Sequence, residues 1–168
     1  MKKTLMILSC LLALPMLAGA QNSGPSIGLF MGSPTGFTFK NIFAKTAAID
    51  IKAGWRLTEN AGLHVTCDYQ FLFPQTMRWT DDYDGAEHEI RGLTPYFGIG
   101  GRFMFAESDD IHNDTEFHVG VRLGGGVEYA ISRFALFLEL YPVIDIIPST
   151  DFDFDGGLGF RFYFSRHR

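Results

Sequence analysis

The sequence predicts an all-β protein, an eight-stranded antiparallel up-and-down transmembrane β-barrel. Three observations favour this fold. Apolar and polar residues alternate with a period of two, charges are confined to one of the two resulting faces, and turn-forming residues separate the alternating segments. A period of two is the signature of a strand, because successive side chains point to opposite faces. A tilted strand of about ten residues, at ~3.3 Å per residue, crosses a bilayer core.

The composition is that of a single folded domain. The chain has 168 residues, of which 46% are hydrophobic, 15% aromatic and 20% charged. This is too apolar for a disordered chain, and the length suits one domain. The formal net charge of -5 argues against a nucleic-acid partner, which would need a basic face.

The first twenty residues have the pattern of a secretory signal peptide. Met1-Lys2-Lys3 is basic, residues 5–17 are largely apolar, and Ala18-Gly19-Ala20 supplies the small residues that a signal peptidase needs. The apolar run is shorter than the ~20 residues of a membrane-spanning helix, which disfavours an anchor. We expect residues 1–20 to be cleaved after export to the periplasm, and residues 21–168 to form the barrel.

The first four predicted strands lie before residue 74. In the first, Ile27, Leu29 and Met31 alternate with Gly28, Phe30 and Gly32. The second covers 37–40, after a turn at 33–36. The third and fourth, 49–57 and 63–73, alternate in the same way on either side of a connection at 58–62. These connections contain Gly, Pro, Ser and Thr, as hairpin turns require.

The last four predicted strands cover 93–105, 117–131, 134–146 and 152–164. The third hairpin connection, 106–116, is long and acidic, whereas 132–133 and 148–150 are short. The alternation is clearest in 117–131, whose even positions are polar, glycine or alanine. Its odd positions are Phe117, Val119, Val121, Leu123, Gly125, Val127, Tyr129 and Ile131.

Residues 74–92 fit this scheme less well. With eight strands they join the fourth to the fifth on the periplasmic side, where turns are usually short. The pair Asp84-Gly85 favours a projecting hairpin. The alternative is an error in the strand count near the N-terminus, which would make this segment a surface loop.

Two features predict that the apolar face points outward. An eight-stranded barrel has an interior just wide enough for side chains to fill, and the apolar face carries too many Phe, Leu and Ile to point inward. The polar face is rich in glycine and carries charges of both signs that could neutralise one another inside. A soluble barrel or sandwich is the alternative. The predicted lumen charge network consists of Lys40, Asp50, Lys52, Arg56, His64, Asp68, Arg102, His118, Arg122, Glu128, Glu139, Asp145 and Arg161.

The end of the chain resembles the closing strand of bacterial outer-membrane barrels. In Gly157-Leu158-Gly159-Phe160-Arg161-Phe162-Tyr163-Phe164, the resemblance implies that Phe160, Phe162 and Phe164 form an assembly signal for the barrel-assembly machinery. The segments 96–103 and 140–151 resemble an uncharacterised family of small outer-membrane barrels, similar in size to outer-membrane protein X and the membrane domain of outer-membrane protein A. This resemblance implies location in the outer membrane, both termini in the periplasm and contact with outer-membrane lipid, but no established activity.

The candidates for chemistry are weak. Asp151, Asp153 and Asp155 have the spacing of a calcium loop, but a helical calcium loop requires Glu where Phe162 stands. A divalent-cation site there, or a metal or ligand site in the 106–116 connection, is less favoured than a solvated or Arg-paired acidic surface. We expect no cofactor.

Catalysis is also disfavoured, although His64 and His118 should face inward near carboxylates. No serine lies within either of their strands, so a nucleophile beside a base is missing. We therefore expect a non-enzymatic barrel with a plugged lumen, serving envelope integrity or binding a surface ligand through its loops. The alternatives are a narrow pore for small solutes, a lipid-modifying enzyme and a soluble ligand-binding barrel.

Overall fold

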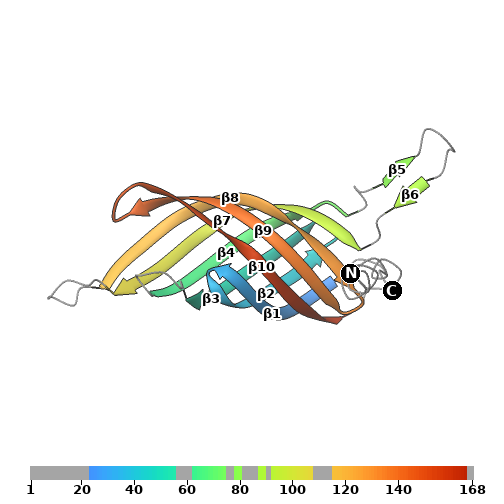
Figure 1. Cartoon of the computed structure of the whole chain (residues 1–168), viewed down its shortest axis with the longest axis horizontal. Coiled ribbons are helices and arrows are strands. Elements are labelled where there is room, and N and C mark those ends of the chain that lie inside the picture. Colours follow the sequence, from blue (N-terminus) through green and yellow to red (C-terminus); the bar gives the residue numbers. More distant parts are fainter. Residues whose placement is uncertain are drawn as a thin grey trace, which may run out of the picture.

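The computed structural model describes residues 23–55, 62–74, 78–80, 87–89, 92–107 and 115–165 (Figure 1). The expected signal peptide and Arg56 lie outside these ranges. The described strands are β1 (Ser23–Ser33), β2 (Thr35–Ala44), β3 (Ala47–Trp55), β4 (Gly62–Leu72), β5 (Arg78–Thr80), β6 (Glu87–Glu89), β7 (Leu93–Glu107), β8 (Thr115–Ile131), β9 (Phe134–Ile147) and β10 (Asp151–Ser165).

Eight of these strands form a closed barrel. Each pairs antiparallel with the strand that precedes it in the barrel, and β10 closes the ring by pairing antiparallel with β1. The spatial order therefore follows the chain order, which is the up-and-down topology. The predicted fold class is confirmed. Among the described residues, no helix is long and apolar enough to cross a membrane.

The remaining two strands form a separate hairpin. β5 and β6 pair antiparallel, with Trp79 opposite His88, and they project beyond one end of the barrel (Figure 1). This is the end at which β1 begins, β4 ends and β10 ends; we name it the terminal end, and the opposite one the far end. The projecting hairpin expected from Asp84-Gly85 is therefore present, and the alternative strand count is wrong.

The first turn is tighter than the sequence predicts. We expected residues 33–36 to form it, but only Pro34 separates β1 from β2. The Thr35 hydroxyl donates to the Gly32 carbonyl oxygen at 2.9 Å and accepts the Gly32 N–H at 3.1 Å. The Thr35 side chain thus provides a hydrogen-bond donor and an acceptor at a turn that is too short for a regular pair of backbone hydrogen bonds.

The barrel has an apolar exterior and a charged interior. Along β9, exposed Leu136, Leu138 and Leu140 alternate with buried Phe137 and Glu139. The exposed fraction of Phe37 is 66%, whereas Lys52, Arg102 and Arg161 on the opposite face are 0% exposed. The predicted assignment of the two faces is observed in every barrel strand.

Glycine allows the barrel to close at the β1–β10 seam. Gly32 lies opposite Gly157, with φ angles of +155° and +159°. A Cβ atom on Gly32 would lie 2.1 Å from the Gly156 carbonyl oxygen, and one on Gly157 would lie 2.2 Å from that of Met31. Any larger residue would push the two strands apart, because the colliding atoms belong to the backbone.

Candidate functional site: a charge network in the barrel lumen

The lumen is the site that the sequence predicts, and its charged side chains are buried together. His118 is half-buried, and Asp153 retains 27% exposure of its side chain at the far end. Among the residues that the structure describes, the buried charged ones comprise five cations and six carboxylates: Lys40, Lys52, Arg102, Arg122, Arg161, and Asp50, Asp68, Glu128, Glu139, Asp145, Asp155.

Arg102 and Arg122 organise the far end of the lumen. Arg102 donates to Asp145, to Asp153 at 2.8 Å and to Asp155 at 3.1 Å. Arg122 donates to the other carboxylate oxygen of Asp155 at 2.9 Å. We name these five residues the far cluster. Charge-assisted bonds of this kind are stronger than neutral ones, so the cluster ties β7, β8, β9 and β10 together across the lumen.

Arg161 and two lysines organise the terminal end. Arg161 contacts Asp50 at 2.5 Å and Glu128 at 2.8 Å. Lys40 contacts Glu128 at 2.9 Å, and Lys52 contacts Asp50 at 2.9 Å. We name these five residues the near cluster. Its members come from β2, β3, β8 and β10, so it links opposite walls of the barrel.

Asp68 and Glu139 connect the two clusters. The Asp68 carboxylate lies 2.9 Å from Arg122 Nε and 3.9 Å from Lys52 Nζ. The Glu139 carboxylate lies 2.8 Å from Lys52 Nζ and 3.7 Å from Arg122. The ion pairs thus continue from one end of the lumen towards the other, and each buried carboxylate has a cation within 4 Å.

Aromatic rings complete the network, and sequence reasoning missed them. The Arg161 guanidinium lies 3.7 Å from the centre of the Phe137 ring, and that of Arg122 lies 4.1 Å from the centre of the Tyr141 ring. Lys40 lies 4.7 Å above the Tyr96 ring. A cation above an aromatic face is stabilised electrostatically when water is excluded. The available signal was the position of these rings on the polar face of each strand.

Tyrosine hydroxyls and one amide also serve the carboxylates. Tyr163 Oη donates to Glu128 at 2.5 Å, and Tyr96 Oη donates to Glu139 at 2.9 Å. Gln70 Nε2 donates to Asp50 at 3.0 Å. These neutral donors satisfy carboxylate lone pairs without adding charge.

Glycines make room for this crowded interior. A Cβ atom on Gly98 would lie 2.2 Å from Tyr141 Oη, and one on Gly100 would lie 2.3 Å from Asp68 Oδ1. The large polar side chains therefore lie directly against the bare backbone of β7. Small residues opposite large ones allow a lumen of this diameter to hold arginine and tyrosine side chains.

Several buried polar atoms lack a hydrogen-bond partner within the described part of the chain, and most lie on β4. They include His64 Nδ1, Thr66 Oγ1 and Gln70 Oε1. These residues occupy alternate positions on the inner face of one strand, so their polar atoms form a row along the lumen wall. Buried polar groups are normally hydrogen-bonded, and a row of this kind is suited to water.

The aspartate motif at the start of β10 is divided between two environments. Asp155 is fully buried in the far cluster, Asp153 contacts Arg102, and Asp151 is exposed and accepts the Phe152 N–H at 2.8 Å. The described residues contain no group of three or more His, Cys, Asp or Glu side chains arranged to hold a metal ion. Asp153 and Asp155 are thus paired with arginine, whereas Asp151 lies at the surface.

His64 does not form a nucleophile–base pair with Ser33, which lies at the far end of β1. His64 Nε2 lies 3.4 Å from Asp155 Oδ2, but Ser33 Oγ donates to the same Asp155 carboxylate at 3.2 Å. The hydroxyl therefore contacts the acid and not the imidazole, whereas activation of a serine requires the base to accept its proton.

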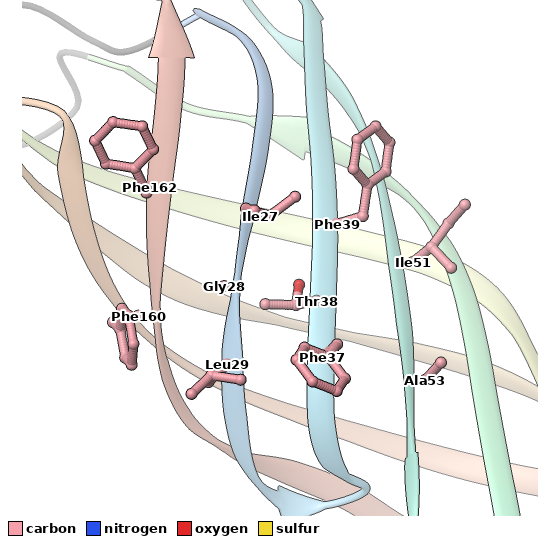
Figure 2. A pocket seen from close by; sticks show the side chains of 10 residues that line it. All are labelled: Ile27, Gly28, Leu29, Phe37, Thr38, Phe39, Ile51, Ala53, Phe160 and Phe162. Atoms are coloured by element: carbon pink, nitrogen blue, oxygen red, sulfur yellow. The ribbon is translucent and has the colours of Figure 1, made fainter.

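The exterior carries a shallow apolar groove along β1 (Figure 2). Its lining residues come from β10, β1, β2 and β3, and they include Ile27 and Leu29 on β1 and the bulkier Phe37, Phe160 and Phe162 on β2 and β10. Its volume is about 490 Å³. The groove is open to the side of the barrel, not to the lumen, so it is separate from the charge network.

Comparison with known proteins gives one structural likeness. No protein-family model and no curated protein matches this sequence. Among solved structures, the chain is similar to the N-terminal β-barrel domain of OprF from Pseudomonas aeruginosa, with a TM-score of 0.64 and 16% identity. The alignment covers 86% of this chain and 100% of that domain. The chain therefore has the fold of an eight-stranded outer-membrane β-barrel domain.

Proposed function

We propose that this protein is an integral outer-membrane β-barrel with a lumen closed by paired charges, and that its role is structural or one of surface interaction. The observation that carries the proposal is the reversal of the usual burial pattern. In the described part of the chain, five cations and six carboxylates are buried inside, while large apolar side chains cover the outside. Water would disfavour such an exterior, whereas a bilayer requires it.

The distribution of aromatic residues on the exterior supports a membrane-spanning orientation. At the far end Phe105 contacts Phe117, with ring centres 5.1 Å apart. At the terminal end Tyr69 contacts Phe71 at 4.9 Å, and Phe134 contacts Phe162 at 5.3 Å. Aliphatic side chains such as those of Leu138, Leu140 and Leu158 lie between. Aromatic girdles on either side of an aliphatic band are typical of transmembrane barrels.

A closed barrel also satisfies its backbone. Every strand of the ring has two neighbours, so the backbone donors and acceptors along the paired segments are satisfied in lipid. The groove along β1 is lined mostly by apolar residues, with Thr38 the polar one among them, and we expect lipid acyl chains to fill it. Outer-membrane lipid is therefore the partner that the exterior supports best.

Cell fractionation combined with gel migration tests this proposal. The protein should fractionate with the outer membrane, resist extraction by salt or carbonate, and migrate faster before boiling than after it. A Leu138→Arg variant should lose the compact unboiled form, because a charge near the bilayer midplane costs about 2–4 kcal/mol. Recovery of the unaltered protein in the soluble periplasmic fraction, without detergent, would instead support a soluble barrel.

A narrow pore is the second candidate, and the row of unpartnered polar atoms on β4 favours it. Water along His64, Thr66 and Gln70 would give a hydrated path beside the ion pairs. In planar bilayers, discrete conductance steps that change in Arg102→Ala or Glu139→Ala would support the pore. The absence of conductance steps for the unaltered protein and for both variants, with folding verified by gel shift, would support the closed lumen.

A further inference from the structure

The outer part of β10 is a strand edge without a neighbour among the described residues. The pairing of β1 with β10 reaches Ser33 opposite Gly156 and stops there, because β1 ends at Ser33. On its other side, β10 stays paired with β9 from Phe162 to Asp151. Residues Asp151–Asp155 therefore extend beyond β1 by about 16 Å, at ~3.3 Å per residue, and on that side no strand in the described part of the chain pairs with them.

The backbone donors of Phe152 and Phe154 point away from β9, towards the side on which no described strand pairs with this part of β10. Tyr163 N–H donates to the Arg133 carbonyl oxygen at 2.8 Å, so odd-numbered residues of β10 donate towards β9. The register contains no bulge, and the even-numbered residues therefore donate in the opposite direction. Phe154 agrees with this, since its partner on β9 is Pro142, which has no N–H.

Two carboxylates of the Asp-Phe-Asp-Phe sequence occupy these donors. Phe152 N–H donates to Asp151 Oδ1, and Phe154 N–H donates to Asp153 Oδ1, both at 2.8 Å. Asp153 uses its second oxygen for Arg102, at 2.8 Å, which holds the carboxylate in place from the lumen side. Each outward donor is thus paired by the residue that precedes it in the chain.

We propose that Asp151 and Asp153 protect this edge from pairing with the same strand of a second copy of the protein. An unpaired strand edge is a template for strand addition, and the exposed Phe152 and Phe154 side chains would add apolar contact between two copies. The carboxylates remove the donors that a second strand would need.

The test compares variants of the full-length protein, purified as folded barrels in detergent. The double variant Asp151→Ala/Asp153→Ala should raise the association constant of the dimer about tenfold or more. The backbone N–H groups of Phe152 and Phe154 then become available for intermolecular hydrogen bonds. Asp151→Asn/Asp153→Asn keeps an acceptor oxygen at each position without charge and should stay as monomeric as the unaltered protein. Light scattering coupled to size exclusion measures the dimer, and the gel shift on boiling verifies folding.

Two further variants identify the surface and the charge effect. Adding Phe152→Pro to the double Ala variant removes an edge donor and should restore the monomer, because proline has no N–H. Asp109→Ala/Asp110→Ala removes two negative charges from the 106–116 connection and should leave the monomer unchanged. The proposal fails if the double Ala variant is monomeric, if the Asn variant dimerises to the same degree, or if Phe152→Pro leaves the dimer intact.

Discussion

Removal of one buried cation from the near cluster should destabilise the barrel strongly. Arg161 contacts two carboxylates, Asp50 at 2.5 Å and Glu128 at 2.8 Å, and it lies 3.7 Å from the Phe137 ring centre. Arg161→Met approximately keeps the side-chain volume but removes the positive charge that both carboxylates contact. Breaking a buried ion pair by removing one partner costs about 3–5 kcal/mol. We expect a loss in that range, and a smaller one for Arg161→Lys, which keeps the charge but not the planar fork.

Urea unfolding of the barrel in lipid vesicles measures this loss, with tryptophan fluorescence as the signal. Trp55 lies on the exterior of β3 and reports transfer from lipid to water. Arg133→Met is the matched control, because Arg133 is exposed in the turn between β8 and β9 and should change stability by less than about 0.5 kcal/mol. A loss below about 1 kcal/mol for Arg161→Met, as for a surface ion pair, would refute the view that these charges are buried and mutually dependent.

Three further predictions concern the lumen wall, the exterior and assembly. Gly100→Ala should lower stability by about 1–3 kcal/mol in the same assay, since its Cβ would lie 2.3 Å from Asp68 Oδ1; Gly101→Ala, whose Cβ would have no neighbour closer than 3.7 Å, should be neutral. Leu138→Arg should lose about 2–4 kcal/mol in vesicles, and an unchanged midpoint would place this residue away from lipid. Phe164→Ala should reduce the folded fraction in cells while barely changing the stability of refolded protein, whereas Phe164→Tyr should assemble normally; equal yields for all would remove the assembly role.

Much of the architecture follows from local pattern. The alternation predicts eight strands, and Asp84-Gly85 predicts the projecting hairpin that β5 and β6 form. The strand boundaries were less predictable. Gly and Pro predicted a turn at 33–36, but hydrogen bonds from the Thr35 side chain to Gly32 allow a shorter one. The alternation predicted which residues lie on the polar face. It did not assign a role to the tyrosine and phenylalanine rings there, because the sequence does not show whether a cation lies above a given ring.

The specific partners within the lumen depend on closure. Lys40 and Glu128 are 88 residues apart in the chain, and Arg102 and Asp153 are 51 apart. Which cation meets which carboxylate depends on the stagger of all eight strands, because a shift of register moves each side chain along the barrel axis. The sequence supplies the charges of both signs, but it contains no local signal for their pairing.

The amino-acid sequence alone determined that each strand has one apolar and one polar face, because a period of two is a property of the extended backbone. The tertiary structure decided which cation lies beside which carboxylate in the lumen, where glycine leaves space for them. It also decided that β10 extends past β1 and exposes two N–H groups to its own aspartates. Both outcomes depend on where strands begin and end relative to their neighbours, and that relation exists only once the ring has closed.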